Sequence, residues 1–256
     1  NVFIMGKGFS LQTNDWLTAE KGHGRGKGQI GPEVQIGSIM GELFEEPVMI
    51  LKVCIGNRSL GWDLLPPSVK AYDYEGKLQP GYGEIPATAG SGEKYEGKEW
   101  YAGTQWDTDT GNAKKILEDL DTYYPGAKDY EVAGFFWWQG DKDMRNPAHF
   151  SNYEKHLVAL IKDLRNEFKA PNAPFVSASL GQTKEGSTGG DGVILEAMKA
   201  VASDKYPEFK GNVGFVYTHP LSKGGSSSGH YSGNAETYMN IGNGMGRAMA
   251  DLFLGK

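Results

Sequence analysis

Three residues suited to acyl-transfer chemistry lie near the ends of apolar runs or at a helix start. Gly56 comes shortly after the run Val48–Cys54, Gln139 directly follows Val132–Trp138, and His230 lies just before the last predicted helix. A glycine N–H and a glutamine NH₂ can donate to a developing oxyanion, and a loop histidine can act as a general base. If the runs are strands of one parallel sheet, their carboxyl ends meet and the three residues line one pocket.

Each of these residues also has a structural interpretation. An isolated glycine after a strand is most often part of a tight turn. Asn234, which follows His230 in the same loop, can cap the last helix, so part of this motif is structural. His219, after another apolar run, is a second candidate base, although a turn before Pro220 explains it equally well. The chemistry therefore depends on the three positions acting together.

Aromatic and amide side chains beside these positions suit a sugar ligand. Trp137 and Trp138 offer apolar faces that match the C–H surface of a sugar ring, although a Trp pair is more often part of a core. Asn57, directly after Gly56, is a further candidate for substrate binding. A buried glutamine is costly unless its amide is hydrogen-bonded, so Gln139 is expected to have polar partners.

Apolar runs alternate with amphipathic stretches along the chain, which predicts parallel strands connected by helices. The expected strands are Val48–Cys54, Val132–Trp138, Phe175–Leu180 and Val213–Thr218. The expected helices are Asn112–Tyr123, Pro147–Phe168, Gly192–Ser203 and Ala235–Leu254. Right-handed crossovers between such strands give an α/β fold, a three-layer αβα sandwich with a mainly parallel sheet.

Composition limits the class of protein and of partner. A chain of 256 residues with 39% hydrophobic residues suits one α/β domain, in which residues 72–111 form an irregular insertion. The net charge of −6 and the absence of a basic stripe argue against nucleic acid as a partner. No apolar run reaches the ~18 residues that a membrane span needs. The single cysteine, Cys54, excludes an internal disulfide and a cysteine-based metal site, and no metal is expected.

Four motifs, in order along the chain, resemble those of the sialate O-acetylesterase-like branch of the SGNH (GDSL-like) hydrolases, which includes carbohydrate acetylesterases such as acetyl xylan esterases. Ile30-Gly31-Pro32-Glu33 resembles the family's I-G-P-E segment. Glu46–Ser68 is similar to its strand block that ends in P-P-S. Trp138-Gln139-Gly140 matches W-Q-G, and residues 230–238 match H-x-x-G-N-A-E-x-Y.

The resemblance implies the flavodoxin-like fold of SGNH hydrolases and a serine hydrolase that removes acetyl esters from sugars or polysaccharides without a cofactor. It also implies that Gly56 and Gln139 are oxyanion donors and that His230 is the general base. In such enzymes a serine attacks the ester carbonyl and forms an acyl-enzyme that water cleaves. An acetylated carbohydrate is the expected partner. A secreted or periplasmic location fits that substrate, although a single cysteine is equally compatible with the cytoplasm.

The nucleophile is the part of the family pattern that this sequence lacks. The family's G-Q-S-N-M motif is absent, and Ser10, after a strand-like stretch with glycines, is the available substitute. The interpretation we favour is that the serine-bearing N-terminal strand lies outside this chain and is supplied by a preceding segment or a separate polypeptide. The acid often found three residues before the family's histidine is Ser227 here, so Asp143 is predicted to orient His230.

Two other functions are compatible with the sequence. A glycan-binding or structural protein that kept the scaffold and lost the nucleophile would explain the altered block around Gly56. A lipase-like esterase fits less well, because the 6 Trp and 13 Tyr residues suit sugars better than acyl chains. In each case the chain could also form a homo-oligomer.

Overall fold

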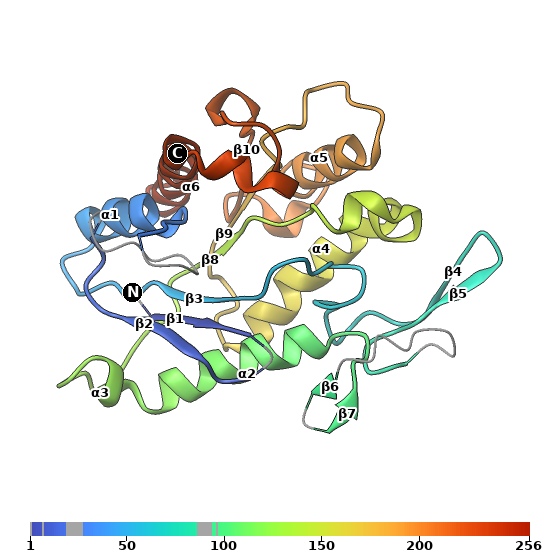
Figure 1. Ribbon diagram of the computed structural model, residues 1–256. Coiled ribbons are helices and arrows are strands. Elements are labelled where there is room, and N and C mark those ends of the chain that lie inside the picture. The colour runs from blue at the N-terminus through green and yellow to red at the C-terminus, as the bar shows by residue number, and fades with distance from the viewer. Residues whose placement is uncertain (1, 7, 19–27, 86–93, 96) are drawn as a thin grey trace.

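Figure 1 shows the computed structural model, which describes residues 2–6, 8–18, 28–85, 94–95 and 97–256. In this part of the chain, six strands form two three-stranded sheets, and the other four strands form two hairpins. No helix among these residues is long and apolar enough to span a bilayer. The molecule is a mixed α/β structure with its helices packed around small sheets.

The first sheet joins the beginning of the chain to the first predicted strand. β1 (Val2–Met5) lies parallel to β3 (Leu51–Cys54), in a register that places Met5 opposite Cys54. β2 (Leu11–Asn14) returns antiparallel to β1 and forms the outer edge. The first three residues of β1 are buried, whereas β2 is largely exposed. β1 is therefore the central strand of this sheet.

The second sheet contains the three remaining predicted strands. β8 (Phe135–Trp137), β9 (Phe175–Ala178) and β10 (Val213–Val216) lie in the order β10-β9-β8, all parallel, with their first residues opposite one another. All four residues of β9 are buried, because this strand has a neighbour on each side and helices on both faces. The two connections β8–β9 and β9–β10 thus each carry the chain back to the same edge of this sheet.

Helices connect the strands and cover them. They are α1 (Glu33–Leu43), α2 (Thr104–Glu118), α3 (Leu120–Tyr123), α4 (Pro147–Glu167), α5 (Gly190–Val201) and α6 (Ala235–Phe253). The starts of α4 and α6 follow from the sequence: Asn146 accepts N–H groups of the first turn of α4, and Asn234 accepts the N–H of Thr237 in α6. These two helices and α5 confirm the helices predicted there, within two residues at each end.

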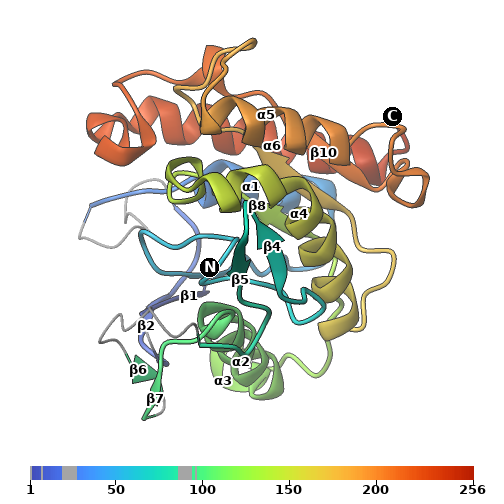
Figure 2. The same ribbon diagram turned by 90° about the vertical axis from the view of Figure 1, so that its right-hand side faces the viewer.

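Consecutive residues of β9 point to opposite faces of the second sheet and into different clusters. Phe175 packs with Leu157 of α4 and Met198 of α5, whereas Val176 packs with residues of α1 and α6 such as Met245. Figures 1 and 2 both place α5 and α6 at one end of the molecule and α2 and α3 at the other. Helices thus cover both faces of this sheet.

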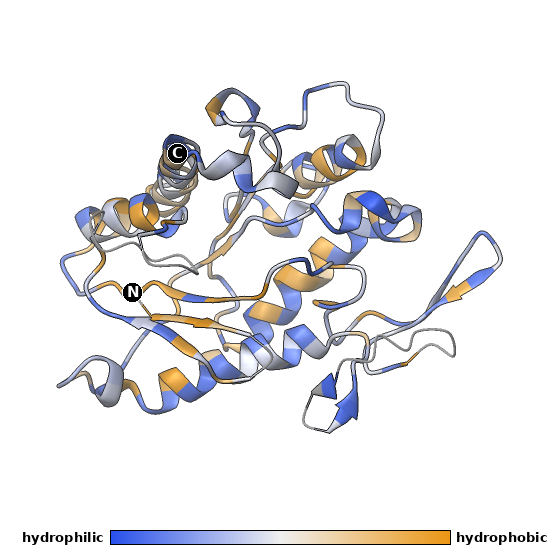
Figure 3. Ribbon diagram, viewed as in Figure 1, coloured by the Kyte–Doolittle hydropathy of each residue, from blue (hydrophilic) through white to orange (hydrophobic). Residues whose placement is uncertain are grey.

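Helix α2 begins well before the helix predicted at Asn112. Its buried face carries polar residues, among them Thr104, Gln105 and Thr108, so a search for apolar periodicity does not detect its first half. Figure 3 shows the contrast: β1 and β3 are mostly orange, whereas α2 has only scattered orange residues. Helix α1 was not predicted either.

The segment predicted as an irregular insertion, residues 72–111, contains regular elements. β4 (Tyr72–Tyr74) pairs with β5 (Lys77–Gln79), and β6 (Lys94–Tyr95) pairs with β7 (Lys98–Glu99), each antiparallel. Both hairpins extend away from the sheets in Figure 1. Residues 86–93 and 96 of this segment lie outside the described part of the chain.

The prediction of one mainly parallel sheet in a three-layer sandwich is confirmed only in part. The strands within each sheet are parallel apart from β2, but among the described residues no strand pairing joins β3 to β8. Every residue of these two strands is partly exposed, unlike those of β9. β3 and β8 each therefore have one edge without a strand partner.

The core assignment gives a direct prediction for stability. Leu157 is fully buried in α4, so Leu157→Ala should leave a cavity and lower the free energy of unfolding by about 2–5 kcal/mol. Leu78, which is 73% exposed on a hairpin, is the matched control, and Leu78→Ala should change stability by less than about 0.5 kcal/mol. Urea unfolding measures both, and equal effects of the two substitutions would contradict the assignment.

Candidate active site

The amide of Gln139 connects the segments that follow β3 and β8. Its Nε2 donates to the carbonyl oxygen of Arg58 at 2.9 Å and to Oδ2 of Asp143 at 2.5 Å. Its Oε1 accepts the hydroxyl hydrogen of Tyr153 at 3.0 Å. Both amide hydrogens and the amide oxygen are thus engaged, as expected for a polar side chain at the end of a core strand.

Asp143 binds the backbone of the loop that follows β3. Its carboxylate is fully buried and accepts the backbone N–H groups of Leu60 at 2.9 Å and Gly61 at 2.8 Å, in addition to the amide of Gln139. Burial raises the pKa of Asp143 to about 6, while these three donors act in the opposite direction. Asp143 and Gln139 therefore hold the two sheets together at their carboxyl ends, where β3 and β8 do not pair.

A second buried carboxylate shapes the same loop. Asp63 accepts the N–H of Ser59 at 2.8 Å and the indole N–H of Trp100 at 2.9 Å. It also pairs with Arg58 at 3.4 Å, and the Arg58 guanidinium lies over the Trp100 ring. Asp63 was not predicted from the sequence, in which its signal is an acidic residue inside an otherwise apolar stretch, Trp62–Pro67.

The loop that carries Gly56 is open toward solvent. Gly56 and Asn57 are exposed, and a side chain added at Gly56 would meet no atom within 4 Å. Asn57 has a left-handed backbone with φ of 59°. The Gly56 N–H is therefore in reach of a bound molecule, although sterics alone do not require glycine there.

His230 lies on an unusual backbone turn. His230, Tyr231 and Ser232 have φ values of 50°, 50° and 53°, three left-handed residues in succession before Gly233. A residue other than glycine is strained by about 1–2 kcal/mol in this conformation, and strained backbone of this kind clusters at functional sites. The His230 side chain is exposed.

Contacts to the ends of β8 and β9 hold this turn in place. The Tyr231 hydroxyl accepts the N–H of Gly181 at 3.0 Å, and its ring stacks on Trp138 with centroids 5.7 Å apart. Ser227, three residues before His230, donates its hydroxyl to Oδ1 of Asp141 at 2.7 Å. The strained turn is thus fixed against the second sheet, at the same edge as Gln139.

These contacts bring three of the predicted site positions to one edge of the molecule. Gly56 follows β3, Gln139 follows β8, and the His230 turn is bound to residues that follow β8 and β9. Asp143 is in contact with Gln139, but in the described part of the chain none of its hydrogen bonds reaches the His230 turn. The carboxylate that does reach it is Asp141.

Trp137 and Trp138 both pack against the core. The indole N–H of Trp137 donates to the Tyr153 hydroxyl at 3.1 Å, and that of Trp138 donates to the Ser179 carbonyl at 3.1 Å. Each ring is partly buried against a different hydrophobic cluster. Their binding of a sugar stays a prediction, as does that of Asn57.

Ser10 lies in the turn between β1 and β2 and is exposed. Its hydroxyl oxygen accepts the amide hydrogen of Gln12 at 2.8 Å. β1 pairs with β2 on one side and β3 on the other, so β3 separates Ser10 from the segment after β8. The structure does not bring Ser10 next to Gln139, and its role as nucleophile stays a prediction.

The other histidines have different surroundings. His219 has its Nδ1 2.8 Å from the Gly181 carbonyl oxygen, which fits a turn role. His149 and His156 lie on α4, and burial lowers the pKa of each to about 4. His23 is outside the described residues. Of the described histidines, only His230 combines exposure with a strained backbone.

The sequence matches a family of carbohydrate esterases, described as sialic acid-specific acetylesterase, over residues 85–251, which is well over half of the chain. The chain belongs to this family. The match includes Gln139, Asp143 and His230, whereas Gly56 and Ser10 precede it. The family resemblance inferred from the sequence motifs is confirmed.

Two solved structures have a similar fold. A protein from Arabidopsis thaliana has a TM-score of 0.56 at 13% identity, covering 97% of this chain and 79% of its own. A carbohydrate acetylesterase from Xanthomonas citri has a TM-score of 0.57 at 11% identity, covering 91% of this chain and 43% of its own. At such low identity these likenesses support the fold and not an activity. No curated protein sequence matches the chain.

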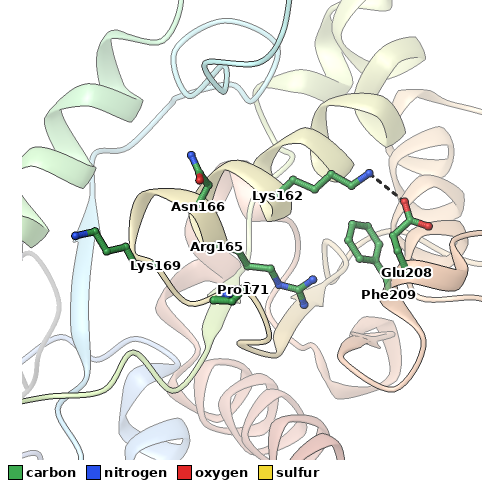
Figure 4. Close-up of a pocket in the computed structure, with 7 residues that line it drawn as sticks. All are labelled: Lys162, Arg165, Asn166, Lys169, Pro171, Glu208 and Phe209. Carbon is green, nitrogen blue, oxygen red and sulfur yellow. Dashed lines mark hydrogen bonds and ion pairs between the residues drawn. The ribbon is translucent and has the colours of Figure 1, made fainter.

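A separate hollow of about 560 Å³ lies at the end of α4, away from Gln139 and His230 (Figure 4). Lys162 pairs there with Glu208 at 3.0 Å, and Arg165 donates to the Ala173 and Asn212 carbonyls. Since Asn212 directly precedes β10, this hollow is at the amino ends of the strands. No cluster of three metal-ligating side chains occurs among the residues that the structure describes.

The raised pKa of Asp143 predicts a pH-dependent stability. Its pKa is about 6 in the folded protein and near 4 in the unfolded chain, so the folded state binds more protons between these values. This group should therefore lower the free energy of unfolding by roughly 3 kcal/mol in total as pH rises from well below the lower pKa to well above the higher one. Asp143→Asn cannot ionise and should remove this contribution.

Urea unfolding of both proteins between pH 3.5 and 7, in ~0.5-unit steps, measures the difference. The lost hydrogen bonds of the variant add an offset that does not change with pH. A stability difference between the two proteins that stays constant across the whole range would contradict the assignment.

Proposed function

We propose that this chain supplies the general base and the oxyanion donors of a carbohydrate O-acetylesterase. The observation that carries the proposal is the His230 turn, which is strained, exposed and bound to residues after β8 and β9. Strain at an exposed histidine beside a strand-end edge is typical of a catalytic loop. Membership of a carbohydrate esterase family supports the same reaction class.

The reaction would follow two acyl-transfer steps. A serine oxygen attacks the acetyl carbonyl carbon while His230 takes the serine proton. The tetrahedral intermediate collapses, the bond to the sugar oxygen breaks, and His230 returns the proton to that oxygen. The sugar leaves with a free hydroxyl and the serine carries the acetyl group. Water, deprotonated by His230, then attacks the acetyl-serine, and acetate leaves as the serine regains its proton.

Gly56 and Gln139 would stabilise the oxyanion in both steps. The Gly56 N–H is on an open loop, whereas both amide hydrogens of Gln139 already have acceptors. Gln139 would have to exchange its bond to the Arg58 carbonyl for one to the oxyanion. The bond to Asp143 is charge-assisted and shorter, so we expect it to persist and keep the amide aligned.

We assign the acid that orients His230 to Asp141 rather than Asp143. Asp143 uses its oxygens to hold Leu60, Gly61 and Gln139, whereas Asp141 accepts the hydroxyl of Ser227 on the His230 turn. Because Ser227 occupies the position where the family often has its acid, the hydroxyl would transmit the influence of Asp141 to the turn. Asp143 would then contribute by fixing the oxyanion loop.

The nucleophilic serine would lie on a further strand between β3 and β8. Each of these strands has an unpaired edge and is only partly buried, and Gln139 and Asp143 join the segments that follow them. A parallel strand entering there would end beside Gly56, Gln139 and the His230 turn. A preceding segment or a separate polypeptide would supply it. Ser10 is the alternative, but β3 separates it from Gln139.

Acetylated carbohydrates are the substrate class we propose, because the family is described as carbohydrate esterases. The Xanthomonas citri relative is itself described as a carbohydrate acetylesterase. A secreted or periplasmic location would suit such a substrate. Comparing hydrolysis rates for different O-acetylated sugars would identify the preferred sugar and the position of its acetyl group.

The central test is the loss of ester hydrolysis in His230→Ala. In the polypeptide that contains the serine-bearing strand, this change should lower kcat for 4-nitrophenyl acetate and for an O-acetylated sugar by at least ~10³-fold, because no base activates the serine. His219→Ala is the matched control and should keep most activity. Equal activity of wild type and His230→Ala would contradict the proposal.

The two candidate nucleophiles differ in labelling by a serine-reactive fluorophosphonate. We expect label on a serine outside residues 1–256 and unchanged labelling in Ser10→Ala, read by mass spectrometry of peptides. Label on Ser10 would refute the inserted strand as its source. A polypeptide of natural length that neither reacts nor turns over acetyl esters would favour the glycan-binding alternative.

Asp141 can be tested independently of the nucleophile's source. Asp141→Asn and Ser227→Ala should each lower kcat by roughly 10- to 100-fold with little change in KM, since His230 would be less well oriented. Ser227→Asp in the Asp141→Asn background should recover part of the loss. Asp204→Asn, an exposed carboxylate far along the chain, is the control. An undiminished kcat in Asp141→Asn would exclude this role.

A further inference from the structure

Two polar side chains on α2, Gln105 and Asp109, face the first sheet, and one acceptor oxygen of this pair has no partner among the described residues. Gln105 is fully buried, and its Oε1 has no hydrogen-bond partner among the described residues. Its Nε2 donates to Oδ1 of Asp109 at 2.5 Å. A buried acceptor that stays unpaired costs about 1–3 kcal/mol, so such a pair calls for a donor.

The position of this pair follows from the rest of α2. Ile116 lies on the same side of the helix and packs on β1 and β3, so Gln105 and Asp109 also face the sheet. The N–H of Gln105 donates to the carbonyl of Asp63 at 2.7 Å, which fixes the start of α2 under the loop after β3. The two acceptors therefore lie below the carboxyl end of β3.

Asp109 is deep in the fold and yet partly accessible. Burial raises its pKa to about 7, with the Gln105 hydrogen bond acting in the opposite direction. Cys54, at the end of β3, behaves similarly: it is partly exposed although burial raises its pKa to about 11. Groups that are deep but still accessible are expected beside the unpaired edge of β3.

The geometry points to a ligand for this pair: we propose that Gln105 and Asp109 receive a hydrogen-bond-donating side chain of the strand that lies between β3 and β8. The inference rests on the proposed function, because that strand carries the nucleophile there. It adds a chemical requirement, namely a hydroxyl, amide or amine directed toward α2 near the strand's carboxyl end.

Other ligands fit less well. A metal ion would need more ligands than one carboxylate and one amide oxygen, and no metal-ligating cluster occurs in the described residues. Asp109 forms no ion pair with another described residue, and Lys52, the cation of β3, pairs with Glu33 of α1 on the opposite face of the sheet. A donor carried by an inserted strand satisfies both acceptors and the unpaired edges together.

The single cysteine of the chain makes the site testable. Leu51 and Val53 pack toward Ile116 of α2, so Cys54 and Lys52 point to the other face. A peptide strand lying parallel to β3 would alternate in the same way. Its cysteine opposite Cys54 would face α1, and the next residue would face α2.

The probes are two extended apolar peptides of about seven residues, identical except for threonine or valine directly after the cysteine. Threonine and valine have nearly the same shape, and only threonine can donate. Each peptide is equilibrated with the 256-residue chain in a glutathione redox buffer at pH 8, and intact mass gives the fraction of mixed disulfide with Cys54. We expect the threonine peptide to be captured roughly tenfold better.

Asp109→Leu removes the acceptor while burying a side chain of similar size, and it should abolish the preference for threonine. A third peptide has threonine directly before the cysteine and valine directly after it. Because its threonine lies away from the carboxyl end of the strand, this peptide should be captured no better than the valine peptide. Equal capture of the first two peptides by the wild-type chain, or no capture above that of a proline-interrupted peptide, would overturn the proposal.

The peptide experiment and the esterase assays test different claims, so a negative result in one does not imply a negative result in the other. The peptides contain no serine and the readout is mass, so a preference for threonine does not depend on turnover. Conversely, loss of activity in His230→Ala does not depend on what Asp109 binds.

Discussion

The amide of Gln139 and the carboxylate of Asp143 meet at 2.5 Å, and through this pair the ends of two separate sheets are held at one edge. Gln139 reaches the Arg58 carbonyl after β3, and Asp143 reaches the N–H groups of Leu60 and Gly61. Among the described residues β3 and β8 share no ladder of hydrogen bonds. These polar contacts, together with the helices on the faces, therefore replace the ladder that would normally fix the relative positions of strand ends.

A buried polar network of this kind is sensitive to every member. Each partner that is lost leaves another unsatisfied in a low-dielectric interior, so the network specifies one arrangement of the loop after β3. The raised pKa of Asp143 shows the cost of burying its charge. On the other side of the edge, the left-handed turn at His230 is strained and is held by Tyr231 and by Ser227. The buried charge and the strained turn both cost folding free energy, and both fix the geometry of the same site.

Apolar patterning was sufficient for the second sheet and for α4, α5 and α6. Their strands are continuous apolar runs, and their helices carry apolar residues at helical spacing or have an asparagine cap. It was insufficient for α2, whose buried face is polar, and for the division of the strands into two sheets. Strand pairing depends on which edges meet, and local sequence does not encode that. Gly56 and Gln139 follow strands that patterning detects, and His230 precedes such a helix, so their positions at the ends of elements could be read from the sequence. Their roles in catalysis stay predictions.

The partners of these positions were harder to predict, because they are set by contacts between distant segments. Asp143 and Asp141 lie two residues apart, yet one serves the loop after β3 and the other serves the turn before α6. In sequence either could orient His230. The distinction arises because Asp143 begins a short helical turn beside Gly61 and is fully buried, whereas Asp141 is partly exposed and accepts the hydroxyl of Ser227. The same reasoning applies to Gln105 and Asp109: a polar helix face opposite an unpaired strand edge has meaning only once both are seen together. A strand with a donor at that edge would satisfy the acceptors and place its end beside His230, so the folding of the sheet and the assembly of the site would be one event.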